Sequence, residues 1–161
     1  MQEEPALRSW WMPFTHNRHF KAHPRLIERG AGAYYTLVDG RRVFDGLSGL
    51  WCCPLGHSPT AVVEAIREQA GILDFSPSFQ MGHPGAFRVA SRITELAGRP
   101  NDRVFFTNSG SEAVDTALKI AVAYHRARGD ASRTRIIGRE RAYHGVGMGG
   151  ISVGGIPANR K

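Results

Sequence analysis

The chain has 161 residues, 42% of them hydrophobic and 22% charged, a balance typical of a globular domain and not of a disordered one. Its net charge of +7 comes from 21 Lys and Arg against 14 Asp and Glu, but the arginines are scattered, which does not favour a nucleic-acid-binding surface. The acidic N-terminus has no long apolar run, and the longest apolar helix pattern contains Asp115 and Lys119, so neither a secretory signal nor a membrane span is expected.

The two cysteines, Cys52 and Cys53, are adjacent in the sequence. A disulfide between neighbouring residues is strained, so we do not expect one. No Cys-x-x-Cys pattern is present, and the sequence therefore supports neither a disulfide framework nor a zinc site. These features indicate a reduced, cytoplasmic protein without a bound metal.

An irregular arm and a hairpin are expected at the start of the chain. Prolines punctuate residues 1–31, which favours irregular structure. The segment 34–38 is rich in β-forming residues, Asp39-Gly40 is a strong hairpin-turn signal, and 43–44 begins the return strand.

Three helices are expected after the hairpin. Ser58 and Pro59 predict the start of the first, as N-cap and first helical residue. Apolar spacing predicts the second from about 84 to 98 and the third from 111 to about 128. The glycine-rich segment 141–155 is expected to be a loop that contains a short helix.

Two short strands are expected to flank the long helix at 111–128. They are DRVFFTN at 102–108 and RTRIIGRE at 133–140, and together with the helix they predict a parallel βαβ unit with a right-handed crossover. The fold class is therefore α/β. A parallel sheet of this type usually has about five or six strands, so we expect this chain to be the N-terminal part of a longer protein.

The turn between the first strand and the long helix has two interpretations. Ser109 and Glu112 have the S-x-x-E spacing of a capping box, which favours an ordinary helix cap. The unpaired N–H groups and the dipole of a helix N-terminus also suit an anion, and Gly110 would let a phosphate approach the backbone. On this stretch alone the cap is favoured, but it leaves Gly110 unexplained, since glycine is unfavourable in a first helical turn.

A second motif, Tyr143-His144-Gly145, follows the second expected strand. In a parallel sheet it would lie at the same edge as the turn before the long helix. Alone it is more often packing than ligand recognition. Beside a phosphate site, an aromatic side chain suits a ligand that is both phosphorylated and aromatic, such as pyridoxal phosphate, a flavin or a nucleotide.

Four segments taken together closely resemble the class III aminotransferases. They are DGLSGLWCCPLGH, FFTNSGSEAVDTALKIA, RERAYHGVGMGGISVGG and the closing NRK. Within them the nearest match is to the omega-amino acid:pyruvate transaminases, and the similarity runs from about Trp11 onward. The resemblance implies a partial aspartate aminotransferase-like fold, pyridoxal 5'-phosphate as cofactor, and a homodimer or homotetramer. It implies transfer of an amino group from an omega-amino acid or amine to pyruvate, with residues 1–57 as arm and hairpin and 58–161 as the first part of the large domain.

The resemblance also implies roles for individual residues. The implied cofactor-binding residues are Ser109, Gly110, Ser111, Tyr143 and His144. Gly110 and Ser111 would hold the phosphate, and Tyr143 would stack on the pyridine ring with His144 beside it. Leu50 and Trp51 would line the substrate pocket, although simple packing is the alternative for both. The loop 79–83 would approach the active site of a partner subunit.

The Schiff-base lysine that the family needs is not expected in this chain. Lys21 lies in the arm, Lys119 in the middle of a helix and Lys161 at the end, and none matches the position of the family's catalytic lysine. No catalytic residue is therefore assigned, and the chain alone is expected to be inactive. Asp45 shows no partner pattern for acid–base chemistry, and His57 is expected only to form loop hydrogen bonds. The alternative is a non-catalytic phosphate- or nucleotide-binding module.

Overall fold

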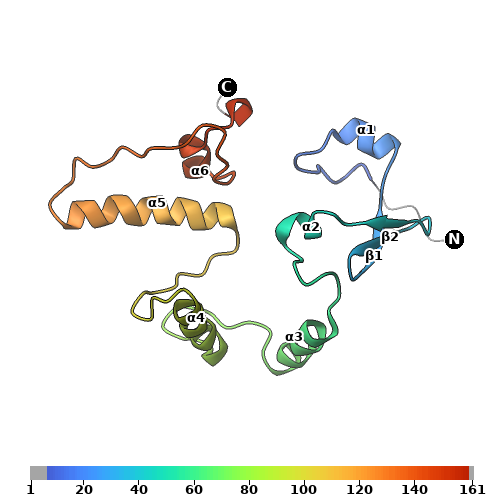
Figure 1. Cartoon of the computed structure of the whole chain (residues 1–161), viewed down its shortest axis with the longest axis horizontal. Helices are drawn as coiled ribbons and strands as arrows, with labels where there is room; N and C mark the ends of the chain where they lie inside the picture. Colours follow the sequence, from blue (N-terminus) through green and yellow to red (C-terminus); the bar gives the residue numbers. More distant parts are fainter. Residues whose placement is uncertain (1–6, 160–161) are drawn as a thin grey trace. The chain divides into compact units, whose positions relative to one another are not determined.

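The computed structural model describes residues 7–159, which form helices, a small β-sheet and long connections (Figure 1). The chain divides into two compact units, Met1–Met81 and Gly82–Lys161. The elements of the first are α1 (Asn17–Ala22), β1 (Ile27–Ala31), β2 (Tyr34–Leu37), β3 (Arg42–Phe44), α2 (Ser48–Trp51) and α3 (Thr60–Ile72). Those of the second are α4 (Pro84–Leu96), α5 (Gly110–Ala127), α6 (Met148–Val153) and a 3-10 turn, η1 (Pro157–Asn159). The expected domain boundary after residue 57 stays a prediction.

The predicted hairpin is confirmed as β2 and β3, within an antiparallel sheet of order β1-β2-β3. Gly40 takes the positive φ of 83° that the turn requires, and its N–H donates to the Leu37 carbonyl. Tyr34 pairs with Phe44 across the ladder, and their rings meet edge to face at 5.6 Å. The expectation of an irregular arm over 1–31 is wrong in part, because α1 and β1 form there.

The start of α3 differs from the expected cap. Ser58 was expected to cap this helix, but Pro59 is the N-cap residue, without a side-chain hydrogen bond. Ser58 has a φ of 54°, and its hydroxyl donates instead to the Gly30 carbonyl on β1 at 2.9 Å. A tertiary contact thus replaces the local one.

The start of α4 is as expected, with Pro84 in the first turn and His83 Nδ1 accepting from the Gly85 N–H at 3.0 Å.

The expected parallel strands are not formed within the described part of this chain. Residues 102–107 and 133–139 have no strand pairing there, and the three paired strands are all antiparallel. A strand needs a neighbour to complete its hydrogen bonds, and the described residues provide none for these two segments. Their apolar side chains are exposed to solvent, since Phe105 is 71% exposed and Ile137 is 96% exposed.

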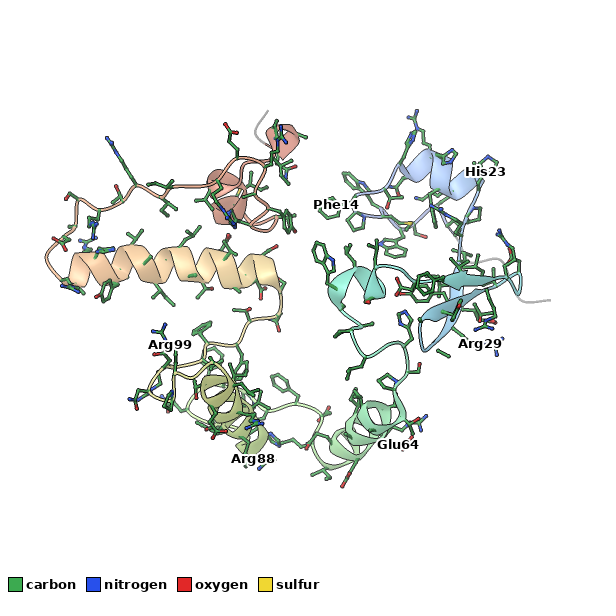
Figure 2. All side chains as sticks on the ribbon, in the orientation of Figure 1. Phe14, His23, Arg29, Glu64, Arg88 and Arg99 are labelled. Atoms are coloured by element: carbon green, nitrogen blue, oxygen red, sulfur yellow. The ribbon has the colours of Figure 1, made fainter. Side chains whose placement is uncertain are left out.

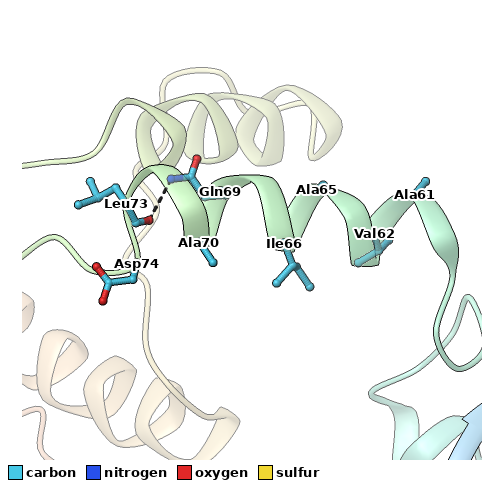
Figure 3. Close-up of a pocket in the computed structure, with 8 residues that line it drawn as sticks. All are labelled: Ala61, Val62, Ala65, Ile66, Gln69, Ala70, Leu73 and Asp74. Atoms are coloured by element: carbon cyan, nitrogen blue, oxygen red, sulfur yellow. Dashed lines mark hydrogen bonds between the residues drawn. The ribbon is translucent and has the colours of Figure 1, made fainter.

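Apolar side chains are exposed throughout the described residues. Leu37 on β2 is the one buried apolar side chain among them. Side chains project into solvent from every helix, including Glu64 on α3 and Arg88 on α4 (Figure 2). A stripe of small and apolar residues along α3 is open as well (Figure 3), and it is formed by Ala61, Val62, Ala65, Ile66, Ala70 and Leu73. None of the described helices is both long and apolar enough to span a bilayer.

Candidate functional site

The first turn of α5 is capped as the sequence predicts. Ser109 is the N-cap residue, and its Oγ accepts from the Glu112 N–H at 3.2 Å. The Glu112 carboxylate turns back and accepts from the Asn108 N–H at 2.8 Å. Since Glu112 is occupied with the preceding backbone, the cap and an anion site can coexist at this helix end.

Gly110 leaves open space at the helix N-terminus. A Cβ built at this position would meet no atom of the described residues within 4 Å. Within the described residues, the backbone N–H groups of Gly110 and Ser111 have no protein acceptor, as usual for the first residues of a helix. Two free donors at the positive end of a helix dipole, with room beside them, are suited to a phosphate.

Ser111 connects this turn to the loop that carries Tyr143 and His144. The N–H of Val146 donates to Ser111 Oγ at 2.9 Å. Because Ser111 Oγ acts as the acceptor in that bond, its own hydrogen is free to donate to a ligand. Gly145 has a φ of 99°, and a Cβ there would lie 2.8 Å from the Ser111 Cα. The two motifs recognised in the sequence are therefore in contact in one unit.

Asp115 on α5 completes the attachment of the glycine-rich loop, a role that no motif in the sequence indicates. Its Oδ1 accepts from the Gly150 N–H at 2.8 Å, at the start of α6. Any Cβ at Gly147 or Gly149 would come too close to the Asp115 carboxylate. The closely spaced glycines were the available signal, since such spacing implies a close approach to another part of the chain.

Tyr143 and His144 are held between this attachment and the end of α6. The Arg141 N–H donates to the Gly155 carbonyl, and the Gly155 N–H donates to the Ala142 carbonyl, both at 2.9 Å. Tyr143 is 55% exposed and His144 is half-buried. An exposed aromatic ring on a fixed loop, in contact with a helix N-terminus, can pack against a planar ligand.

Leu50 and Trp51 lie in the other unit, on the short turn α2. Ser48, Gly49, Leu50 and Trp51 all have positive φ, at 49°, 59°, 54° and 72°. This left-handed geometry costs about 1–2 kcal/mol per residue that has a side chain. Leu50 and Trp51 are 64% and 76% exposed, so they do not belong to a core formed by the described residues.

A buried carboxylate, Asp45, holds that turn. Its Oδ1 accepts from the Leu47 N–H at 3.1 Å and its Oδ2 from the Gly49 N–H at 2.6 Å. His57 Nε2 lies 2.8 Å from the same Oδ2, as a donor to the carboxylate, and the Tyr35 ring packs on His57 at 4.2 Å. The expectation that His57 forms hydrogen bonds in its loop is confirmed, and one of its partners is Asp45, which the sequence did not indicate. Sequence spacing could not show a contact across 12 residues.

The electrostatics of this cluster favour a charged Asp45 and a neutral Tyr35. Burial raises the pKa of Asp45, but hydrogen bonds from His57 and from the Gly49 and Leu47 N–H groups outweigh it and hold that pKa below its usual 3.8. Burial, and then the neighbouring Asp45 charge, raise the pKa of Tyr35 above its usual 10.0. The cluster is therefore a fixed ionised acceptor at neutral pH.

The open helix N-terminus at Gly110 and the neighbouring loop with Tyr143 are an arrangement that suits a phosphorylated, planar ligand. The family model of "Aminotransferase class-III" matches residues 15–160. The chain therefore belongs to the class III aminotransferases, which are pyridoxal-phosphate-dependent.

Individual proteins with similar sequences are aminotransferases as well. The chain is 58% identical over 154 residues to an omega-aminotransferase of Caulobacter vibrioides, covering 96% of the chain and 35% of the relative. It is 48% identical over 161 residues to a beta-alanine–pyruvate aminotransferase of Pseudomonas aeruginosa, covering 100% of the chain and 36% of the relative. The chain thus spans about a third of the length of the curated relatives it matches.

Solved structures confirm the fold class. The omega transaminase from Pseudomonas jessenii in complex with PMP superposes with a TM-score of 0.91 at 32% identity, over 96% of this chain and 35% of that one. A protein described as a transaminase with L-Ala superposes with a TM-score of 0.86 at 35% identity, over 96% of this chain and 35% of that one. The described chain is a partial α/β fold of the pyridoxal-phosphate-dependent transaminases.

Proposed function

We propose that this chain is the N-terminal part of an enzyme that transfers an amino group from an omega-amino acid or an amine to pyruvate. Its family and the names of the relatives, an omega-aminotransferase and a beta-alanine–pyruvate aminotransferase, support this activity. Pyridoxal phosphate, when bound, would supply the electron sink that this reaction needs. The chain's own contribution is to bind and orient that cofactor.

The single observation that carries the proposal is the open helix end at Gly110. Its free N–H, the N–H of Ser111 and the Ser111 hydroxyl are donors without a protein acceptor among the described residues, and Gly110 leaves room for a phosphate. Ser109 accepts one hydrogen bond and also keeps its hydroxyl hydrogen for donation. We propose that these three residues hold the cofactor phosphate.

We propose that Tyr143 stacks on the pyridine ring and that His144 lies beside it. The contact of Gly145 with Ser111 fixes the distance between this aromatic group and the phosphate donors. Stacking of this kind would keep the ring plane oriented and exclude water from one of its faces. In the other unit, we propose that the exposed Leu50 and Trp51 form part of the wall that meets the amino donor.

The catalytic lysine is proposed to lie in the part of the enzyme beyond this chain. Lys119 is exposed in the middle of α5, and Lys21 on α1 donates to the Arg8 carbonyl at 3.2 Å. Lys161 lies outside the described residues. Neither described lysine belongs to the candidate site. A homodimer or homotetramer and a cytoplasmic location stay predictions for the complete protein.

The activity test uses the complete protein with beta-alanine or an aromatic amine as donor and pyruvate as acceptor. The proposal predicts amino transfer and a cofactor absorbance band, with the cofactor fixed to a lysine by borohydride reduction. Absence of that band would contradict cofactor binding. Amino transfer by the 161-residue chain alone would contradict the location of the lysine. Nucleotide binding without amino transfer would favour the alternative of a non-catalytic binding module.

A further inference from the structure

The left-handed turn α2 needs an external support, since its own hydrogen bonds are few. The Trp51 N–H donates to the Leu47 carbonyl at 2.9 Å, and the Cys53 N–H donates to the Ser48 carbonyl at 2.8 Å. Ser48, Leu50 and Trp51 have side chains and nevertheless adopt positive φ. Residues of this kind keep such a conformation only where the surrounding structure enforces it.

Asp45 is placed to provide that support. Its two oxygens accept from the N–H groups of Leu47 and Gly49, which flank Ser48, the first residue of the turn. The Asp45 side chain is only 8% exposed, so these bonds are shielded from competing water. A buried, ionised acceptor with two backbone donors sets the direction in which the chain leaves β3.

His57 and Tyr35 tie Asp45 to the antiparallel sheet. His57 is 11% exposed and donates to Asp45 Oδ2. Its backbone forms both hydrogen bonds of a bridge with Gly32, at 3.1 and 2.8 Å, directly after β1. A Cβ at Gly30 would lie 2.9 Å from the His57 Cβ, so His57 is packed closely on that strand. Tyr35, on β2, packs against the imidazole with the ring centroids 4.2 Å apart.

We propose that Asp45, supported by His57 and Tyr35, is a positioning residue for donor selectivity. It fixes the handedness of α2 and, through it, the direction of Leu50 and Trp51. This inference rests on the proposed function, in which these two side chains meet the amino donor. Asp45 acts on the substrate only through the turn. It therefore influences how bulky and aromatic donors fit while leaving the chemical step and cofactor binding alone.

The test compares Asp45→Asn with Asp39→Asn in the complete protein. Asn has the size of Asp but lacks its charge and cannot accept all three hydrogen bonds. Asp39 is a matched control, because it is an exposed carboxylate of the same hairpin that accepts from Arg41. Asp45→Asn is expected to raise KM for an aromatic amine and to change the kcat/KM ratio of aromatic amine to beta-alanine on the order of tenfold. The cofactor spectrum should stay unchanged, and Asp39→Asn should leave the ratio as it is.

A double-mutant cycle separates positioning from general destabilisation. In a Trp51→Ala background, Asp45→Asn is expected to shift the donor ratio by less than about twofold, since the side chain through which it acts is gone. A shift that persists in this background, or one that Asp39→Asn reproduces, would overturn the proposal. If Asp45→Asn fails to fold, Tyr35→Phe supplies the milder variant, with a smaller ratio change that also vanishes without Trp51.

A crystal structure of the Asp45→Asn variant tests the same proposal without any activity. Ser48, Leu50 and Trp51 are expected to leave the positive-φ region, and they should retain it in Asp39→Asn. A turn that stays left-handed in Asp45→Asn would refute the role of Asp45. A wild-type protein without amino transfer would instead refute the proposed function, so the two failures are distinguishable.

Discussion

Gly145 and Ser111 are in direct contact, and no side chain fits between them. A Cβ at position 145 would lie 2.8 Å from both the Cα and the Oγ of Ser111, and Gly145 has a φ of 99°. The same Ser111 Oγ accepts from the next N–H of the loop, that of Val146. This contact places the aromatic loop at the helix end proposed to hold a phosphate.

Gly145→Ala is expected to destabilise the protein and weaken cofactor binding. The positive φ alone costs about 1–3 kcal/mol in a residue with a Cβ, and the overlap with Ser111 adds to it. Gly129→Ala is the matched control, since Gly129 has a φ of 89° but open space around it. Urea unfolding should show a larger loss for Gly145→Ala, and cofactor titration should show a lower affinity for that variant alone. Equal effects of both variants would contradict the contact.

Gly110→Ala is expected to leave the stability of the fold intact and to lower the affinity for the cofactor. Its Cβ would meet no atom within 4 Å in the part of the chain that the structure describes. Alanine in a helix is favoured over glycine by up to about 1 kcal/mol, so stability without cofactor should be unchanged or higher. Where a phosphate lies against residue 110, the new methyl group should reduce affinity on the order of tenfold or more. Gly71→Ala in α3 is the control, because it also has open space in a helix. Unimpaired cofactor affinity in Gly110→Ala would place the phosphate elsewhere.

Asp115→Ala is expected to release the glycine-rich loop from α5. The variant leaves the N–H of the buried Gly150 without its acceptor, which costs about 1–3 kcal/mol. Asp102→Ala removes a carboxylate from an exposed ion pair with Arg99 and should cost less than about 1 kcal/mol. Hydrogen exchange of the Gly150 and Val146 amides should increase in the first variant only. Unchanged protection of both amides would show that Asp115 does not hold the loop.

The Asp45 cluster gives stability two dependences on pH. The folded-state pKa of Asp45 is lowered, so its contribution is present above the unfolded value near 3.8 and is lost as pH falls through the lower folded value. The folded-state pKa of Tyr35 is raised, so its contribution is present below 10.0 and is lost as pH rises through the higher folded value. Unfolding by urea across pH should lose part of its acid dependence in Asp45→Asn and part of its alkaline dependence in Tyr35→Phe. If both variants showed the same dependence of stability on pH as the wild-type protein, these assignments would be contradicted.

Local signals in the sequence identified the hairpin at Asp39-Gly40, the cap at Ser109 and the helices α4 and α5. Each depends on residues a few positions apart, so pattern and structure agree. The Ser58 cap was wrong because its hydroxyl bonds to Gly30 on another strand. β1 lacks a clear alternation of apolar and polar residues, and it forms because β2 offers it backbone partners.

The candidate site was only partly predictable for the same reason. The turn at Gly110 and the motif at Tyr143 were visible, since each is a short run of distinctive residues. The roles of Asp115 and Asp45 were not visible in the sequence. Each carboxylate accepts hydrogen bonds from backbone N–H groups, and any residue type can provide such a group, so no sequence pattern marks the partners. Residues 102–107 and 133–139 show the opposite case, where a strand pattern lacks the neighbouring strands that would pair with it.

The most direct test of the central claim is a crystal structure of the complete protein with pyridoxal phosphate. The phosphate is expected within about 2.7–3.2 Å of the N–H groups of Gly110 and Ser111 and of the Ser111 hydroxyl, with the Tyr143 ring against the pyridine. A phosphate bound away from the first turn of α5, with Gly110 facing only solvent, would contradict the claim.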